Sequence, residues 1–92
     1  MLEFQPTTQF KKDYKRLRRR GLDLNELKVV LKVLQNQEEL DEKYRDHGLS
    51  GRYSGFRECH IRPDWLLIYK VNEYELVLVA SRTGTHSDLF NE

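Results

Sequence analysis

The chain has 92 residues, 38% of them hydrophobic and 34% charged, a composition that suits one small folded domain spanning residues 1–92. A single cysteine excludes an internal disulfide and favours a reducing, cytoplasmic location, and residues 1–12 lack the apolar run of a signal peptide or membrane helix. The net charge of +1 hides a basic first segment, because residues 1–20 hold seven basic residues against only Glu3 and Asp13.

The first predicted element is a short strand over residues 2–6, where apolar and polar side chains alternate before a proline. Thr7 or Thr8 should then cap a helix that ends before Gly21, because apolar side chains recur here at helical spacing. Basic side chains cover most of the remaining helix surface and favour a polyanionic partner, although a solvated helix face would carry the same charges. They are Lys11, Lys12, Lys15, Arg16, Arg18, Arg19 and Arg20.

A second helix should follow at once. Asp23 and Glu26 fit a capping-box pattern at its start, with aspartate in place of serine or threonine. One apolar stripe then runs along it, made by Leu24, Leu27, Val30, Leu31 and Leu34. The polar connection over residues 35–51 contains two glycines and is long for a compact domain, which raises the chance that it carries function.

The second half of the chain predicts three strands, over residues 56–62, 64–71 and 75–82. Pro63 separates the first two, and residues 72–74 suit a tight turn before the third. The order is therefore β-α-α-β-β-β. We predict an α+β fold in which two N-terminal helices pack on one face of a small, mostly antiparallel sheet, with the last three strands as a meander and the first strand at an edge.

The sequence offers little support for a metal site or cofactor, and we predict none. Cys59 and His60 are adjacent on a strand, so their side chains point to opposite faces and cannot share one ion. A site made by His47, His60, Asp64 and His86 is conceivable, but no pair of them has a metal-ligand spacing. Cys59 should face the core as a small apolar side chain and not act as a nucleophile.

The histidines are better candidates for chemistry. His47 lies in a glycine-flanked loop within the polar connection, His60 lies near a strand end and His86 lies in a polar segment, so none has the setting of a core histidine. Each alone could be an ordinary surface residue. With Asp64 and Arg82 also near strand ends, the set suits cleavage of RNA by its own 2′-hydroxyl without a metal, which needs a base, an acid and a cation for the phosphate.

Three segments of this chain resemble the RelE/YafQ family of bacterial type II toxins, closest to the YafQ branch. They are "YRDHGLSG", "GFRECHIRPDWLLIYKV" and "SRTGTHSDLF". The resemblance implies a RelE-like fold and a ribosome-dependent endoribonuclease that cuts mRNA in the ribosomal A site. It also implies a cognate antitoxin protein, similar to RelB or DinJ, that holds the toxin inactive.

The resemblance assigns roles to individual residues. It implies acid–base catalysis by His47, His60, Asp64 and His86, with His86 or Asp64 as the base and the other as acid or orienting group. Arg82 would contact the phosphate, while Phe90 and Trp65 would be aromatic substrate contacts. For Trp65 the alternative is a place in the core, and for Phe90 an apolar contact with the sheet. The basic first helix would bind ribosomal RNA.

Two other functions fit parts of the pattern. A non-catalytic nucleic-acid-binding module would need only the basic helix, and a protein-interaction domain would need neither basic helix nor histidines. The His86→Ala substitution distinguishes them, because only a nuclease should lose its activity. Arg82, His86 and Phe90 stand at steps of four, but Gly84 should break any helix that would place them on one face.

Overall fold

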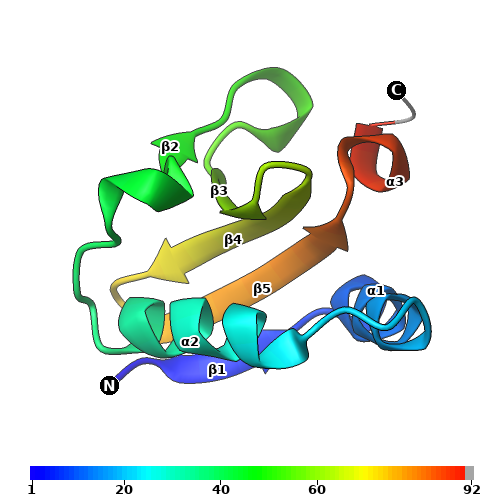
Figure 1. Ribbon diagram of the computed structural model, residues 1–92. Helices are drawn as coiled ribbons and strands as arrows, with labels where there is room; N and C mark the ends of the chain where they lie inside the picture. Colours follow the sequence, from blue (N-terminus) through cyan, green and yellow to red (C-terminus); the bar gives the residue numbers. More distant parts are fainter. Residues whose placement is uncertain (91–92) are drawn as a thin grey trace.

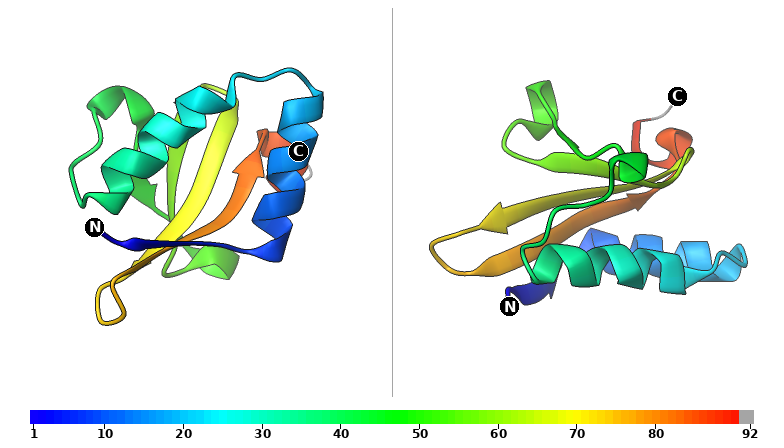
Figure 2. Two further views of the ribbon diagram at one scale, coloured as in Figure 1. Left: turned by 90° about the horizontal axis from the view of Figure 1, so that it is seen from below. Right: turned by 60° about the vertical axis from the view of Figure 1, so that its left-hand side comes forward.

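The computed structural model describes residues 1–90 as one sheet with two long helices against one face (Figure 1). The elements in chain order are β1 (Glu3–Pro6), α1 (Thr8–Arg19), α2 (Leu24–Gln35), the 3-10 turn η1 (Glu42–Tyr44), β2 (His47–Gly48), the 3-10 turn η2 (Gly51–Tyr53), β3 (Arg57–Arg62), β4 (Trp65–Asn72), β5 (Val77–Gly84) and α3 (His86–Phe90). Figure 2 shows that α1 and α2 lie on the same side of the sheet. Among the described residues, no helix is long and apolar enough to cross a membrane.

The five strands lie in the spatial order β1-β5-β4-β3-β2. β3, β4 and β5 form an antiparallel meander, and β1 pairs in parallel with β5 at one edge. The predicted α+β fold, with its meander and its edge strand, is therefore confirmed. The two-residue strand β2 is not predicted from the sequence. It pairs with β3 at the opposite edge, where His47 lies across from Glu58.

Side-chain caps fix where both long helices begin. The side chains of Thr7 and Asp23 accept backbone amides in the first turns of α1 and α2, each at 3.0 Å. The predicted capping box at Asp23 is wrong in its second hydrogen bond. The Glu26 carboxylate accepts from Arg62 of β3 at 2.6 Å and not from the backbone amide of Asp23. This ion pair connects α2 to the sheet.

Alternation along β4 sends its side chains into two apolar clusters, one on each face of the sheet. Leu67 packs in the larger cluster beneath α1 and α2, whereas Leu66 packs in a smaller cluster with Leu89 of α3. Cys59 is fully buried in the larger cluster, as predicted. Burial raises the pKa of its thiol to about 12, so Cys59 is no nucleophile near neutral pH.

The short helix α3 follows β5 directly, after Gly84. As predicted, no helix places Arg82, His86 and Phe90 on one face, although His86 and Phe90 lie one turn apart in α3 with ring centroids separated by 6.5 Å. Arg82 belongs to β5 and stands apart from that face. The helix forms because Thr85 and Asp88 cap it reciprocally. The Thr85 amide donates to the Asp88 carboxylate at 2.9 Å, and the Asp88 amide donates to the Thr85 hydroxyl at 3.0 Å.

Candidate active site

Three histidines that are far apart in the sequence lie in a row along one side of the sheet. The ring centroids of His47 in β2 and His60 in β3 are 6.2 Å apart, and those of His60 and His86 in α3 are 5.9 Å apart. The pairing of β2 with β3 and the meander that leads into α3 produce this arrangement. The structure thus brings together all three histidines that were predicted to be catalytic.

Aromatic side chains continue this row. Phe90 lies 6.5 Å from His86, Tyr53 lies 5.9 Å from Phe90, and Phe56 lies 6.1 Å from Tyr53, each between ring centroids. We call the line of rings from His47 to Phe56 the ring row. Phe90 also packs against the smaller apolar cluster, as its alternative interpretation expected. Tyr53 and Phe56 are not among the predicted site residues, because their local pattern is that of ordinary apolar residues near a turn.

Asp64 and His86 form the shortest polar contact along the ring row. Asp64 Oδ1, in the turn between β3 and β4, lies 2.7 Å from His86 Nδ1 and accepts the His86 backbone amide at 2.9 Å. These two hydrogen bonds, with the backbone one the larger cause, lower the pKa of Asp64. A carboxylate that accepts Nδ1–H fixes the imidazole tautomer and leaves Nε2 able to exchange a proton. Both side chains are exposed, so a substrate can reach them.

Glu58 is a candidate site residue that the sequence did not indicate. Its carboxylate is buried and lies 3.5 Å from Nε2 of His47 and 3.4 Å from Nε2 of His60. Nδ1 of these two rings contacts the carbonyls of Arg45 and Pro63, at 2.8 and 3.2 Å, so both rings turn Nε2 toward Glu58. The spacing of Glu58 and His60, two residues apart on a strand and so on one face, is the signal that could have revealed it.

His47, Glu58 and His60 could also hold a metal ion. One ligand atom from each lies within 4.8 Å of the other two. Imidazole and carboxylate ligands suit Zn²⁺, Cu²⁺ and Ni²⁺, and carbonyl contacts at the second ring nitrogen are typical of metal-binding histidines. The metal site considered from the sequence combined these two histidines with Asp64 and His86. The structure instead places Glu58 with them as the third possible ligand.

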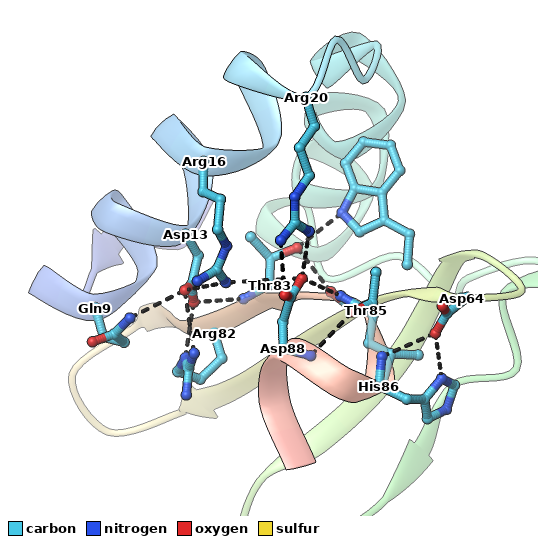
Figure 3. A network of polar contacts seen from close by, with 12 residues as sticks. Gln9, Asp13, Arg16, Arg20, Asp64, Arg82, Thr83, Thr85, His86 and Asp88 are labelled. Atoms are coloured by element: carbon cyan, nitrogen blue, oxygen red, sulfur yellow. Dashed lines mark hydrogen bonds and ion pairs between the residues drawn. The ribbon is translucent and has the colours of Figure 1, made fainter. Parts of the chain in front are cut away.

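Arg82, the predicted phosphate contact, is held by a carboxylate of α1. Asp13 is fully buried and accepts hydrogen bonds from Arg82 Nε at 2.8 Å and from Arg82 Nη2 at 3.2 Å. Figure 3 shows that the same carboxylate also accepts from Gln9, Arg16 and the Thr83 amide. The hydrogen bond to Asp13 raises the pKa of Arg82, so this guanidinium is a permanent cation. Two of its N–H groups are engaged by Asp13 in a fixed direction.

Two of the predicted RNA-binding residues on α1 are engaged within the protein. Arg16 lies 3.0 Å from Asp13, and Arg20 makes two hydrogen bonds to Asp88 of α3, at 2.7 and 3.0 Å (Figure 3). Among the described residues, carboxylates offset both charges, unlike those of the other cations on α1, and the RNA contacts of Arg16 and Arg20 stay a prediction. The remaining side chains are exposed and form what we call the basic patch: Lys11, Lys12, Lys15, Arg18 and Arg19.

The expected substrate contact of Trp65 is also corrected. Its side chain is 3% exposed and packs in the larger apolar cluster, and its indole N–H donates to the Thr83 hydroxyl at 3.0 Å. A ring buried on all sides has no face on which a base can stack. The register of β3 against β4 shifts between His60 and Arg62, and Trp65 pairs with Arg62 just beyond this shift.

A family model describing a bacterial toxin of type II toxin–antitoxin systems, YafQ, matches residues 2–91 of the chain. The chain belongs to the YafQ family. The mRNA interferase toxin YafQ of Escherichia coli strain K12 is 42% identical to it over 83 residues, which are 89% of this chain and 88% of that protein.

Two solved structures show the same fold as this YafQ-family chain. A metal-bound toxin from Helicobacter pylori is 42% identical with a TM-score of 0.93, covering 98% of this chain and all of that one (100%). The toxin fold found in the DinJ–YafQ complex of E. coli is 38% identical with a TM-score of 0.88, covering 98% of this chain and 99% of that one. The family resemblance seen in the sequence is therefore confirmed, and the chain is a toxin of a type II toxin–antitoxin system.

Proposed function

We propose that the chain is an mRNA interferase, an endoribonuclease that cuts mRNA in the A site of the ribosome, and hence acts in the cytoplasm. The contact of His86 with Asp64 beside the ring row carries this proposal. Cleavage by the 2′-hydroxyl needs groups that take and return a proton near neutral pH, and an imidazole oriented by a carboxylate is such a group. The name of the E. coli relative, at 42% identity, points to the same activity.

In the proposed reaction, His86 Nε2 takes the proton of the 2′-hydroxyl while Asp64 holds Nδ1–H. The 2′-oxygen forms a bond to the adjacent phosphorus, and the bond from phosphorus to the 5′-oxygen breaks. Protonated His60 or His47 then gives its proton to the leaving 5′-oxygen. Glu58 lies 3.5 Å from Nε2 of His47 and 3.4 Å from Nε2 of His60, so its carboxylate can orient either ring.

Charge and stacking complete the proposed site. Arg82 stabilises the negative charge that grows on the phosphorus oxygens, and its bonds to Asp13 hold it in one orientation for this task. Phe90 and Tyr53, which meet edge to face, offer rings on which exposed bases can stack. This mechanism needs no metal ion.

The test is induced expression of the wild type and of His86→Ala in bacteria, with growth and mRNA cleavage as readouts. We expect the wild type to arrest growth and cut mRNA, and His86→Ala to do neither while it still folds and binds its antitoxin. If His86→Ala arrests growth as strongly as the wild type, the chain is a non-catalytic binding module and this proposal is wrong.

The ribosome contact is proposed to lie on the basic patch. Its five exposed cations stand on α1 within reach of a phosphate backbone, and none of them forms an ion pair with another described residue. Lys and Arg side chains that neutralise phosphates release counterions, which gives affinity without sequence preference. The mRNA then enters the ring row while the patch holds the ribosomal RNA.

The antitoxin is proposed to cover a groove beside the same patch. The groove has a volume of about 460 Å³ and an apolar floor that includes Phe4, Phe10 and Leu31. Basic side chains at its rim, Lys11, Lys15, Arg18 and Lys28, call for an acidic partner segment with an apolar face. Lys11→Glu with Lys28→Glu should weaken antitoxin capture in a pull-down; unchanged capture would place the antitoxin elsewhere.

A second candidate function is metal binding by His47, Glu58 and His60. The toxin from H. pylori was solved with a metal bound, and the geometry of this trio suits a transition-metal ion. An ion there would occupy Nε2 of both histidines and so remove them as proton donors. Calorimetric titration with Zn²⁺, Ni²⁺ and Cu²⁺ should detect binding in the wild type and a weaker affinity in Glu58→Gln. Equal affinity in both proteins would exclude this site.

A further inference from the structure

The helix that carries His86 and Phe90 is too short to be stable by itself. α3 spans five residues, whereas an isolated helix in water needs roughly 12 to 15 residues even to be marginal. Its position must therefore come from contacts with the rest of the protein. Leu89 supplies an apolar contact on one side, because it packs with the smaller cluster. Asp64 holds the first residue of α3 through the backbone amide and ring of His86, and a second carboxylate holds the helix toward α1.

Asp88 is that second carboxylate, and it joins α3 to α1. It caps α3 through Thr85, and it accepts two hydrogen bonds from Arg20, just after α1, at 2.7 and 3.0 Å (Figure 3). Arg16 lies 3.9 Å away and adds a second positive charge. A bidentate arginine–carboxylate contact fixes direction as well as distance.

Gly84 gives independent support for a tightly seated Asp88. Its φ is +156°, and a Cβ placed on it would lie 2.9 Å from Asp88 Oδ2 and 3.0 Å from Asp88 Cβ. Real Cβ atoms essentially never approach another atom so closely. Because Gly84 has no Cβ, the Asp88 side chain can occupy this space.

We propose that Arg20 and Asp88 are positioning residues for the ribonuclease, which hold α3 against α1 so that His86 and Phe90 stay in the ring row. The proposal rests on the proposed function for its catalytic consequence, but not for its structural one. It gives Arg20 a role different from the basic patch: its charge is offset by Asp88 and serves the geometry of the site. A shift of about 1 Å caused by a distant substitution can lower a rate on the order of a hundredfold.

The activity test compares Asp88→Asn, Arg20→Ala and their double variant in single-turnover cleavage on programmed ribosomes. We expect each single variant to lower the rate at saturating ribosome by roughly tenfold to a hundredfold, with little change in ribosome affinity, and the double variant to be no slower than the slower single one. Glu26→Gln is the control, because it removes the charge from another bidentate arginine–carboxylate pair, with Arg62, and should keep the wild-type rate.

Two results would overturn the proposal in this test. One is a wild-type rate in Asp88→Asn. The other is a loss of ribosome affinity in Arg20→Ala that Asp88→Asn does not share, which would make Arg20 an RNA contact. Arg20→Lys keeps the charge but loses the bidentate geometry, so it should restore little of the cleavage rate that Arg20→Ala loses.

Hydrogen exchange measures the positioning without any RNA. The Leu89 amide bonds the Thr85 carbonyl at 3.1 Å inside α3, so its exchange reports opening of this helix. We expect faster exchange at Leu89 in Asp88→Asn and Arg20→Ala, but not in Glu26→Gln, with unchanged exchange at core amides such as Leu67. Unchanged exchange at Leu89 would overturn the proposal. If the wild type cuts no RNA but Leu89 exchange rises as expected, the proposed function fails and the positioning of α3 stands.

Discussion

Each histidine of the ring row has its Nδ1 atom committed to a fixed partner. For His47 and His60 the partner is a backbone carbonyl, and for His86 it is the Asp64 carboxylate. A carbonyl orients a ring, whereas a carboxylate also stabilises the imidazolium that forms when Nε2 takes a proton. The three rings therefore differ at Nδ1, and this difference is the reason for proposing His86 as the base.

Asp64→Asn tests this difference. We expect cleavage to fall by at least about tenfold, because an amide stabilises an imidazolium less well and can present its NH₂ group to Nδ1. The fall should be smaller than that of His86→Ala, since the imidazole itself remains. The measurement is the single-turnover rate of the purified toxin on programmed ribosomes. A rate equal to the wild type would leave Asp64 without a catalytic role.

Trp65→Phe tests the core position of Trp65. The substitution removes the indole hydrogen bond to the Thr83 hydroxyl and leaves a void beneath α1 and α2. We expect the free energy of unfolding to fall by roughly 1 to 3 kcal/mol. Urea denaturation followed by circular dichroism measures it. A stability equal to the wild type would mean that Trp65 is not packed as the structure shows.

At the scale of elements, β5 and α3 together organise the candidate site, and both depend on α1. Asp13 in α1 holds Arg82 of β5, and Arg20 just after α1 holds Asp88 of α3. The basic character of α1 thus has two origins: some of its cations are structural partners of distant carboxylates, and others face solvent. The linear sequence shows both kinds as one run of positive charge.

The Arg20–Asp88 pair predicts a specific sensitivity to acid. The hydrogen bond from Arg20 is the first cause that lowers the pKa of Asp88 far below its ordinary value of 3.8. A carboxyl with a lowered folded-state pKa stabilises the protein above its ordinary pKa, and this contribution is lost as the pH falls below about 4. In urea denaturation, the wild type should therefore exceed Asp88→Asn in stability at pH 6, and the difference should shrink at pH 3. A constant difference would contradict the ion pair.

At the scale of the whole molecule, the ring row and the basic patch, for which we propose different roles, lie on different elements. The ring row gathers β2, β3, η2 and α3, while the basic patch lies on α1 beside the apolar groove. The protein is nearly neutral overall, so the proposed attraction to ribosomal RNA would be local to the patch. An antitoxin on that groove would screen the same charges.

Salt dependence tests the division of the basic residues. Lys12→Ala with Lys15→Ala should weaken ribosome binding and reduce the slope of log affinity against log salt by roughly 0.7 to 0.9 for each phosphate that the variant no longer neutralises. Asp88→Asn should leave that slope unchanged. A slope that does not respond to the two lysines would remove the basic patch from the ribosome interface.

The sequence by itself determined the fold class, the order of the two long helices and the four longer strands, the family and most of the candidate site residues. These follow from short-range patterns: alternation, helical spacing, caps, and motifs such as "HIRPDW" and "RTGTH". Only the tertiary structure decided that Glu58 lies between two histidines, that Trp65 belongs to the core and that Arg16 and Arg20 are already paired. Each of these facts depends on which residues meet across strands or between α1 and the last elements of the chain. Such meetings are set by sheet register and packing, which one-dimensional spacing does not encode.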